Sequence, residues 1–599
     1  MRSRDLRRGN AFFFVGFRSE FFEMSDSNPL NIFPPPKKTT LTGGVFAPFD
    51  DGEEFWSNIE DENFSNQHFR LEISASGKIL IRHGKGDQLG LDSAVFVCEQ
   101  LMQKFGVFDI PCCVIEDWPD VPVRGFMLDV SRGRVPKMSA LRNLVKTLAR
   151  LRYNQLQLYI EHTYEFKNHE DVWCDASPLT AKNLKDLDEM CREHGIELVP
   201  NLNSFGHVER WLKHEKYKPL AECPNGFYHE IFKMQRVAGT FAACEETADF
   251  MGGLYDEFLP NFSSDKFNIG GDEPWELGQG RSRELCEKHG KRAVYLEHMA
   301  RLKKRVEAHG KKMMFWGDVL LGETGEIPPE FLKNTIPVVW GYDAGHPFDE
   351  QCSRVKTALE KAGGNGEFYL APGTSSWLSF GTRQTNAIQN IREACAAAKR
   401  HGATGVLLTT WGDFGYHNQY CANWLPLVFA AEEMWSGNAE ASEEHFSEIL
   451  DWVLEKTPDD YAKALFRFGK LDDCISKKIT NRSITREMFF AKGEAFEKVM
   501  DGVPVAEVAA AQAELACVMK IFSQISEKTV RRHDWAAEFS VALKMADAAL
   551  RRADAFLKND AGTLAAVEAE MRGPIKDAFA AAWKRTNHEG GLAESLSWF

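Results

Sequence analysis

The sequence has no excess of positive charge, no long apolar run and no paired cysteine motif. Its 72 Lys and Arg residues are outnumbered by 87 Asp and Glu residues, so the formal net charge is −15. Such an acidic chain lacks the global charge excess of a nucleic-acid binder, and we expect no nucleic-acid partner. None of the 13 cysteines forms a C-x-x-C pair, which excludes a zinc knuckle and a thioredoxin motif. We expect mostly buried free thiols and predict a cytoplasmic location.

The N-terminus imitates a signal peptide without completing one. Residues 1–8 are basic and residues 11–17 are apolar, but Arg18 closes the run and no small-residue cleavage site follows. So short a run is also too short to cross a bilayer, and we expect no membrane association. We predict that residues 1–25 are a disordered or mis-started extension, with Met24 as the alternative start.

The overall composition is that of an ordinary globular protein. With 44% apolar and 27% charged residues, global disorder and collagen-like repeats are excluded. Residues 69–73 and 79–81 alternate around a Ser-Gly turn, which predicts a β-hairpin. Residues 91–105 carry apolar side chains at helical spacing. We therefore predict a small α+β accessory domain over residues 26–118.

The next part of the chain alternates short apolar runs with amphipathic segments. The eight runs are 125–130, 155–160, 197–203, 266–271, 312–318, 335–342, 367–373 and 405–413. The main segments between them are 139–151, 181–194, 281–308 and 386–401. This alternation predicts an α/β fold, a (β/α)8 TIM barrel over residues 119–435, although a doubly wound open sheet would alternate too. Residues 436–599 lack strand signals and predict an all-α region with helices near 443–454, 482–499, 505–524, 536–556 and 563–583.

Polar and aromatic residues gather where these strands are expected to end. They are Asp129, Glu161, His162, His207, Asp272, Glu273, Trp316, Trp340, Trp377, Trp411 and Asp413. In a barrel all of these would converge on one mouth, whereas an open sheet would spread them along a crevice. Any single tryptophan is more simply explained as core, but four at one rim favour a site for sugar rings.

The most informative segment ends the fourth expected strand with two glycines and two consecutive carboxylates, Asp272 and Glu273. Glycines allow a ligand or backbone to approach closely. Adjacent carboxylates repel, so the pKa of one should rise, which suits a general acid for glycoside cleavage. The alternative is an acidic first turn of a helix, where such residues are also favoured.

Four segments make the sequence similar to glycoside hydrolase family 20, the β-N-acetylhexosaminidases: residues 124–129, 203–207, 270–273 and 411–413. The helical tail resembles that of a bacterial branch of the family. The resemblance implies an exo-acting, retaining hydrolase of terminal β-linked GlcNAc or GalNAc. In that chemistry the substrate's own 2-acetamido group is the nucleophile, and no cofactor or metal takes part. The implied partner is a small oligosaccharide or glycoconjugate, and the helical tail could pair two subunits as a homodimer.

The resemblance also implies residue roles. Glu273 would protonate the leaving oxygen and then activate water, while Asp272 would orient the acetamide. Arg124 and Asp413 would bind sugar hydroxyls, and His207 would tune the protonation of Glu273. The ring would be enclosed by Trp316, Trp340, Trp377 and Trp411. Asp129, Glu161 and His162 would support this set from behind.

Three departures from the family pattern leave questions open. After the second strand, either Glu161 or His162 replaces the Asp that usually partners the histidine. The acetamide-binding Tyr expected after the seventh strand is not identifiable, since Tyr369 falls within that strand. The acid at the eighth strand is Asp413, where many members carry Glu. Two other functions also stay open: a metal-dependent barrel hydrolase using Asp129, His162, His207 and Asp318, and a sugar-binding homologue without catalysis.

Overall fold

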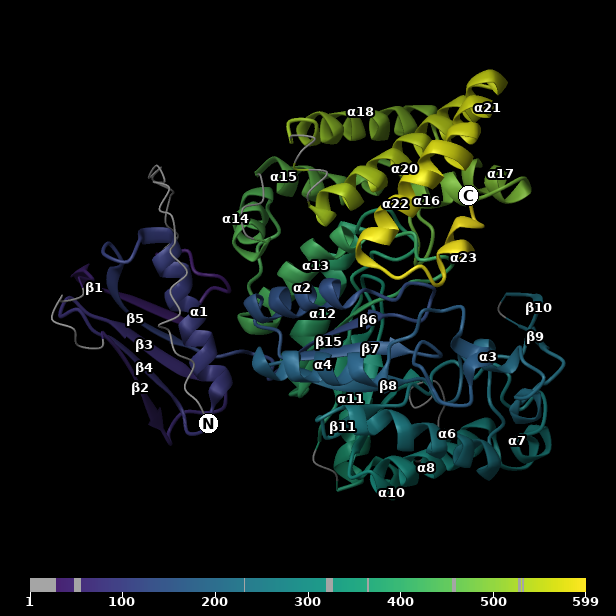
Figure 1. The fold of residues 1–599 in the computed structure, drawn as a ribbon, viewed down its shortest axis with the longest axis horizontal. Coiled ribbons are helices and arrows are strands. Elements are labelled where there is room, and N and C mark those ends of the chain that lie inside the picture. Colours follow the sequence, from purple (N-terminus) through teal and green to yellow (C-terminus); the bar gives the residue numbers. More distant parts are fainter. Residues whose placement is uncertain are drawn as a thin grey trace.

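The structure is a computed structural model, and it describes residues 28–47, 55–230, 232–318, 327–363, 366–454, 459–525, 529 and 533–599 of the 599. The predicted extension over residues 1–25, with Met24, lies outside the described residues. Figure 1 shows a sheet with one helix at one end of the molecule, a barrel beside it, and a layer of helices over one side of the barrel.

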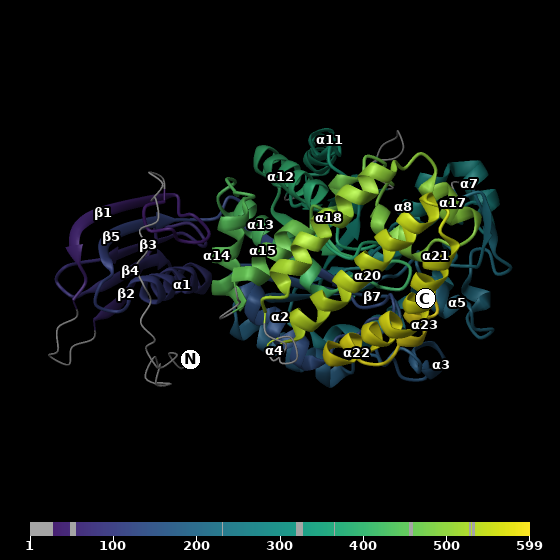
Figure 2. The same ribbon diagram turned by 90° about the horizontal axis from the view of Figure 1, so that it is seen from above.

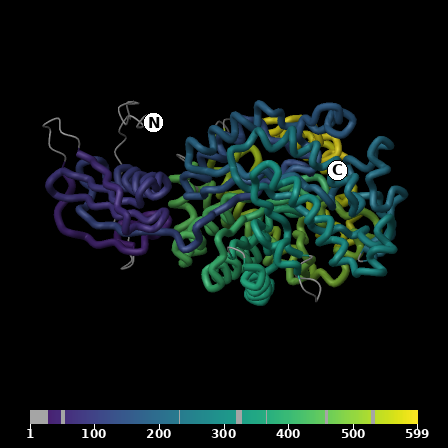
Figure 3. Tube along the Cα trace, turned by 90° about the horizontal axis from the view of Figure 1, so that it is seen from below, coloured from purple at the N-terminus to yellow at the C-terminus, as the bar shows by residue number. Residues whose placement is uncertain are grey.

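The N-terminal part is a five-stranded sheet covered by one helix. Its strands are β1 (Lys38–Val45), β2 (Trp56–Asp61), β3 (Phe69–Ile73), β4 (Ile79–Gly84) and β5 (Pro111–Asp117), in the order β1-β5-β3-β4-β2. The predicted hairpin is confirmed, because β3 and β4 pair antiparallel with Leu71 opposite Ile81. Alternate residues of both strands face α1 (Gln88–Phe105), which buries Val97 and Leu101. Figures 2 and 3 show this unit standing to one side of the barrel.

The predicted barrel is confirmed as a closed ring of eight parallel strands. They are β6 (Val123–Asp129), β7 (Gln155–Ile160), β8 (Glu197–Leu202), β11 (Lys266–Asn268), β12 (Lys312–Trp316), β13 (Thr335–Trp340), β14 (Tyr369–Ala371) and β15 (Gly405–Thr410). Each expected run contains one strand, but most strands end earlier than the run. β11 stops at Asn268 because Gly270 and Gly271 have φ values of 71° and 89°, outside the extended region.

Helices between the strands cover the outside of the barrel. The main ones are α2 (Met138–Arg150), α4 (Ala181–Glu193), α6 (Glu245–Phe258), α8 (Lys291–Ala308), α11 (Phe348–Lys361), α12 (Gln384–His401) and α13 (Trp424–Trp435). The segment predicted as one helix over 281–308 is two helices, α7 (Arg283–His289) and α8. Gly290 separates them because its φ is 84°, a left-handed value that a continuous helix cannot adopt.

Amide side chains inside the barrel anchor the end of β11. Gln157 Oε1 accepts hydrogen bonds from the amides of Asn201, at 2.9 Å, and Asn268, at 3.1 Å. Asn268 Oδ1 in turn accepts from the backbone N–H of Gly270 at 3.0 Å. Hydrogen bonds between buried side chains and backbone groups rigidify their surroundings. The loop carrying Asp272 and Glu273 therefore starts from a fixed point.

The C-terminal part is helical, as predicted. It contains α14 (Glu443–Leu454), α15 (Asp459–Phe468), α16 (Ile484–Phe490), α17 (Glu494–Met500), α18 (Val505–Phe522), α20 (Asp534–Leu557), α21 (Ala561–Glu570), α22 (Lys576–Thr586) and α23 (Leu592–Leu596). Two predicted helices are each divided, one at Gly493 and one at a π-helical turn (Met571–Ile575) containing Pro574. No helix among the described residues is apolar enough over sufficient length to cross a bilayer.

One buried arginine ties this helical part to the barrel. The Arg134 guanidinium donates to the carbonyl oxygens of Asn418 at 2.7 Å and Tyr416 at 3.1 Å. Its other face lies 4.7 Å from the ring centre of Trp583 in α22. Because the hydrophobic core is also continuous from the barrel into these helices, the two parts pack as one body.

Candidate active site

The loop after β11 brings two carboxylates to the barrel mouth, by which we mean the carboxyl ends of the barrel strands and the loops that follow them. Both glycines of this loop are required by close contacts. A Cβ on Gly270 would lie 1.9 Å from Asn203 Oδ1, and one on Gly271 would lie 2.6 Å from Met299 Cε. Glu273 itself adopts a φ of 47°, a strained value of the kind that concentrates at functional sites.

His207 lies between the two carboxylates. Its Nε2 is 3.3 Å from Asp272 Oδ2 and 3.5 Å from Glu273 Oε2. Burial alone would lower the pKa of His207, but the charge of Asp272 outweighs burial and raises it to about 10. His207 is therefore a cation at neutral pH. The structure brings His207 and the acid pair together, as the sequence predicts.

The surroundings of the Glu273 carboxyl group shift its pKa upward. Burial raises its pKa and Asp272 raises it further, whereas His207 and Arg132 oppose the shift. Its backbone N–H donates to Asp318 Oδ2 at 3.3 Å. Burial and the charge of Asp272 also raise the pKa of Asp318, to about 7. Asp318, which the sequence suggested as a ligand in the metal alternative, thus belongs to the site.

The arginine at the mouth is Arg132, which follows the end of β6. Its guanidinium reaches three carboxylates, at 2.9 Å to Asp129 and 3.4 Å each to Glu161 and Asp413. The same group lies 5.0 Å from the ring centre of Trp411. One side chain therefore links loops from three strands, and its exposed fraction of 21% leaves part of it open to solvent.

The prediction that Arg124 binds the sugar is wrong. Arg124 lies in β6 close to its start, so it sits at the end of the barrel opposite the mouth. Its guanidinium is buried, donates to backbone carbonyls of Val121 and Arg152, and stacks 4.8 Å from the Trp435 ring centre. A guanidinium held in this way serves packing between the barrel and the N-terminal sheet.

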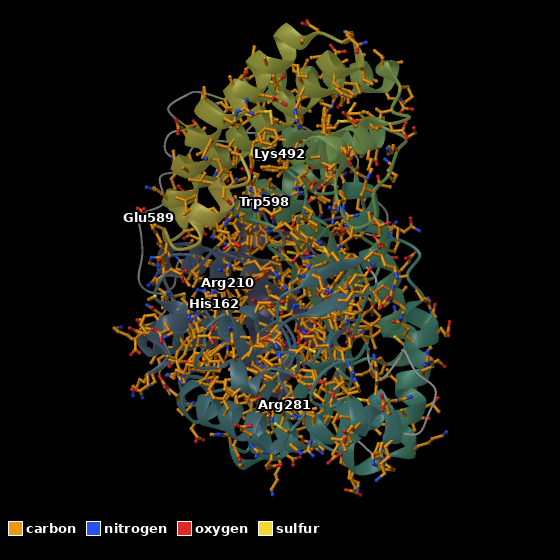
Figure 4. All side chains as sticks on the ribbon, turned by 90° about the vertical axis from the view of Figure 1, so that its right-hand side faces the viewer. His162, Arg210, Arg281, Lys492, Glu589 and Trp598 are labelled. Carbon is orange, nitrogen blue, oxygen red and sulfur yellow. The ribbon has the colours of Figure 1, made fainter. Side chains whose placement is uncertain are left out.

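Of the two candidates after the second strand, Glu161 rather than His162 is the residue beside His207. Glu161 accepts from the Tyr159 hydroxyl at 2.9 Å, and burial raises its pKa to about 7 against the lowering effect of Arg132 and His207. Burial and the nearby cation of Arg210 lower the pKa of His162 to about 3. Figure 4, which faces the mouth side, shows His162 next to Arg210. Asp129 accepts from the Gly412 N–H at 2.9 Å and so fixes the loop after β15.

The four predicted tryptophans do meet at the mouth. Trp316 and Trp411 lie 6.1 Å apart between ring centres, and Trp340 is the most exposed of the four. Tyr342, two residues after β13, joins them. Its ring is stacked 5.2 Å from Trp340 and lies edge-on at 5.2 Å to Trp377. Burial raises the pKa of Tyr342 and the charge of Asp272 adds to this, so its hydroxyl stays protonated close to the acid pair.

Several buried polar atoms at the mouth find no hydrogen-bond partner among the described residues. They include the indole nitrogens of Trp316, Trp340 and Trp411, His207 Nε2, and one carboxylate oxygen each of Asp272 and Asp318. Buried polar groups are normally paired, and unpaired ones call for an explanation such as a ligand. Such donors and acceptors lined by aromatic rings match a molecule that carries hydroxyl or amide groups on an apolar ring.

The geometry gives the metal alternative no support. No cluster of three His, Cys, Asp or Glu side chains with the spacing of a metal site occurs among the residues that the structure describes. Of the four residues considered for it, His207 faces the acid pair.

Comparisons with known proteins agree with this geometry. The family model described as glycosyl hydrolase family 20, catalytic domain, matches residues 122–438, just over half of the chain. A beta-hexosaminidase of Akkermansia muciniphila is 25% identical over 299 residues, which are 46% of this chain and 57% of that protein. The beta-hexosaminidase subunit beta of Mus musculus is 24% identical over 181 residues, 28% of this chain and 32% of that one. The chain thus spans less than two thirds of the length of each of these two relatives.

Solved structures share the fold. A beta-N-acetylhexosaminidase from Bacteroides fragilis gives a TM-score of 0.54 at 18% identity, covering 71% of this chain and 94% of that one. A chitobiase from Flavobacterium johnsoniae gives 0.57 at 15% identity, covering 95% and 98%. Together with the match of the family model across the whole barrel, these findings show that the chain belongs to glycosyl hydrolase family 20.

Proposed function

We propose that this protein is an exo-β-N-acetylhexosaminidase that removes terminal β-linked GlcNAc or GalNAc with retention of configuration. The observation that carries the proposal is the pairing of Asp272 and Glu273 around the cationic His207, beneath a wall of tryptophans. Family membership and the names of the relatives, which are beta-hexosaminidases, support the same reaction.

Glu273 is the proposed general acid and, after cleavage, the general base. Burial and the charge of Asp272 raise its pKa, which is the direction that an acid catalyst requires. It donates this proton to the glycosidic oxygen as the bond from that oxygen to the anomeric carbon breaks. In the second step the resulting carboxylate takes a proton from the water that attacks the anomeric carbon.

Asp272 is the proposed partner of the substrate's acetamide. The acetamide carbonyl oxygen attacks the anomeric carbon and forms an oxazolinium ion, so no side chain bonds covalently to the sugar. The free oxygen of Asp272 accepts the acetamide N–H and stabilises the positive charge that develops on the ring. The hydroxyl of Tyr342, close to Asp272, donates to the acetamide carbonyl oxygen and holds it for attack.

The remaining mouth residues bind the sugar. Arg132 and Asp413, which contact each other at 3.4 Å, supply donors and acceptors for the ring hydroxyls. Trp316, Trp340, Trp377 and Trp411 enclose the ring and the acetamide methyl. The substrate we propose is a small oligosaccharide or glycoconjugate in the cytoplasm; the homodimer stays a prediction.

The test compares the wild-type protein with Glu273→Gln on two aryl N-acetyl-β-glucosaminides. With p-nitrophenol as leaving group, loss of the acid should lower kcat/KM by about 10²- to 10⁴-fold. With 2,4-dinitrophenol, which departs without a proton, the loss of the first step should be much smaller. Glu189→Gln, on the exposed face of α4, is the matched control and should leave both rates unchanged. Equal turnover by Glu273→Gln and wild type on p-nitrophenyl substrate would refute the assignment.

A further inference from the structure

The loop after β15 carries Asp413 and is bent into an unusual conformation. We call residues 411–418 the Asp413 loop. Phe414, Gly415 and Tyr416, which follow the carboxylate, have φ values of 51°, 101° and 51°. A left-handed backbone is costly for phenylalanine and tyrosine, and it persists only where the surrounding structure holds it. The contacts that hold this loop therefore decide where the Asp413 carboxylate lies.

The two neighbours of Asp413 are held by different parts of the molecule. On the barrel side, the backbone N–H of Gly412 donates to Asp129 at 2.9 Å. On the other side, the guanidinium of Arg486, in α16 of the helical part, donates to the carbonyl oxygen of Phe414 at 3.2 Å. Arg486 is only 3% exposed, so little water competes for this hydrogen bond. Asp413 thus lies between one anchor in the barrel and one in the helices.

Trp598, two residues after α23, packs against both the arginine and the loop. Its ring centre is 5.5 Å from the guanidinium of Arg486 and 6.0 Å from the ring centre of Phe414, at an angle of 74°. A Cβ on Gly415 would lie 2.9 Å from Trp598 Cδ1, so the loop backbone passes directly against the indole. Figure 4 shows Trp598 at the boundary between the C-terminal helices and the barrel. This one side chain therefore supports the guanidinium and the turn together.

The later part of the loop is tied to the same segment. His417 is buried, and its Nε2–H donates to the carbonyl oxygen of Ser595 in α23 at 3.0 Å. Burial and the charge of Arg486 lower the pKa of His417 to about 3, so the imidazole stays neutral. The helical part thus contacts the Asp413 loop at three successive places, Phe414, Gly415 and His417.

We propose that Arg486 and Trp598 are positioning residues, which hold the Asp413 loop in the turn that presents the Asp413 carboxylate to the hydroxyls of the reacting sugar. This inference rests on the proposed function. Neither residue needs to touch the substrate, because both act through Asp413, whose side chain is 29% exposed at the mouth and lies 3.4 Å from Arg132. The helical part is then an extension of the active site as well as a support for the barrel.

A double-mutant cycle with Asp413 tests this role. A misplacement of about 1 Å in a binding group can cost about 10²-fold in rate. We expect Trp598→Ala and Arg486→Met each to lower kcat/KM for p-nitrophenyl N-acetyl-β-glucosaminide roughly tenfold, at a folded fraction matched by circular dichroism. In an Asp413→Ala background the same substitutions should cost less than about twofold, because no carboxylate is left to displace. Trp598→Phe, which keeps a ring against Phe414, should retain most of the activity.

Two control variants remove the same kinds of side chain from the helical part, in contacts that do not involve the Asp413 loop. Trp535→Ala removes a partly buried indole whose ring centre lies 4.1 Å from that of Tyr461 in α15. Arg467→Met breaks an ion pair with Glu514 at 2.8 Å. Both controls should leave kcat/KM per folded protein unchanged, whatever they do to the melting temperature.

The cycle separates failure of this inference from failure of the proposed function. If Trp598→Ala and Arg486→Met lose the same factor with and without the Asp413 carboxylate, they act only through packing and the positioning role is refuted. Folded variants that lose nothing would refute it too. A wild type that does not hydrolyse the glycoside would overturn the proposed function, and this inference with it.

Discussion

Substitution of Arg132 by lysine should show that Arg132, and not Arg124, binds the sugar. The planar guanidinium of Arg132 contacts Asp129, Glu161 and Asp413 at 2.9–3.4 Å, and a lysine ammonium can reach only one of them in that geometry. The same change removes about two of the charged hydrogen bonds that the guanidinium is proposed to donate to the sugar in the transition state, each worth about 1.5–3 kcal/mol. The summed loss of about 3–6 kcal/mol corresponds to a decrease of about 10²- to 10⁴-fold in kcat/KM.

The matched variant is Arg124→Lys. Arg124 is buried at the opposite end of the barrel, so this variant should lower the melting temperature without changing kcat/KM per folded site. The assay is p-nitrophenyl N-acetyl-β-glucosaminide hydrolysis, with the folded fraction counted by titration with a tight thiazoline inhibitor. If Arg124→Lys loses catalysis per site while Arg132→Lys keeps it, the placement of the sugar-binding arginine is refuted.

Two further predictions concern the residues around the acid pair. The charge of His207 lowers the pKa of Glu273. His207→Gln should therefore raise that pKa and move the alkaline limb of the kcat/KM profile to higher pH; a limb that stays in place or moves down would contradict this. Tyr342→Phe should lower kcat by about 10- to 100-fold, because one hydrogen bond to the reacting acetamide is lost, while the melting temperature stays within a few degrees. A kcat within twofold of wild type would exclude Tyr342 as the acetamide donor.

The barrel was predictable because its signal is repeated. Every expected run from residue 125 to 413 contains a strand, and the alternation of runs and helices predicts both the number of strands and the closure. The strand ends were less predictable. β11 and β14 are only three residues long, since glycines and close side-chain contacts rather than hydrophobicity end them. The acid pair was identifiable because the two glycines before it mark the end of the fourth strand.

The prediction for Arg124 was wrong, although the sequence also contains the better candidate, Arg132. Arg124 stands at the start of a strand and Arg132 after its end, so the rule that barrel sites form at carboxyl ends favours Arg132. Tyr342 and Asp318 likewise follow strand ends by two residues. No sequence pattern predicted the hairpin over residues 227–236, which lies beside Glu273. Its position depends on the buried hydrogen bonds of Glu276 to distant backbone groups, which no local pattern reveals.

The central claim is that the substrate's acetamide is the nucleophile and that Asp272 and Glu273 assist it. The most direct test measures kcat/KM for aryl glycosides whose N-acetyl group carries zero, one, two or three fluorine atoms. Fluorine withdraws electrons from the carbonyl oxygen and weakens its attack, so kcat/KM should fall steeply with each added atom. A rate that stays constant across the series would contradict the account, because the bond to the anomeric carbon would then be made by another group.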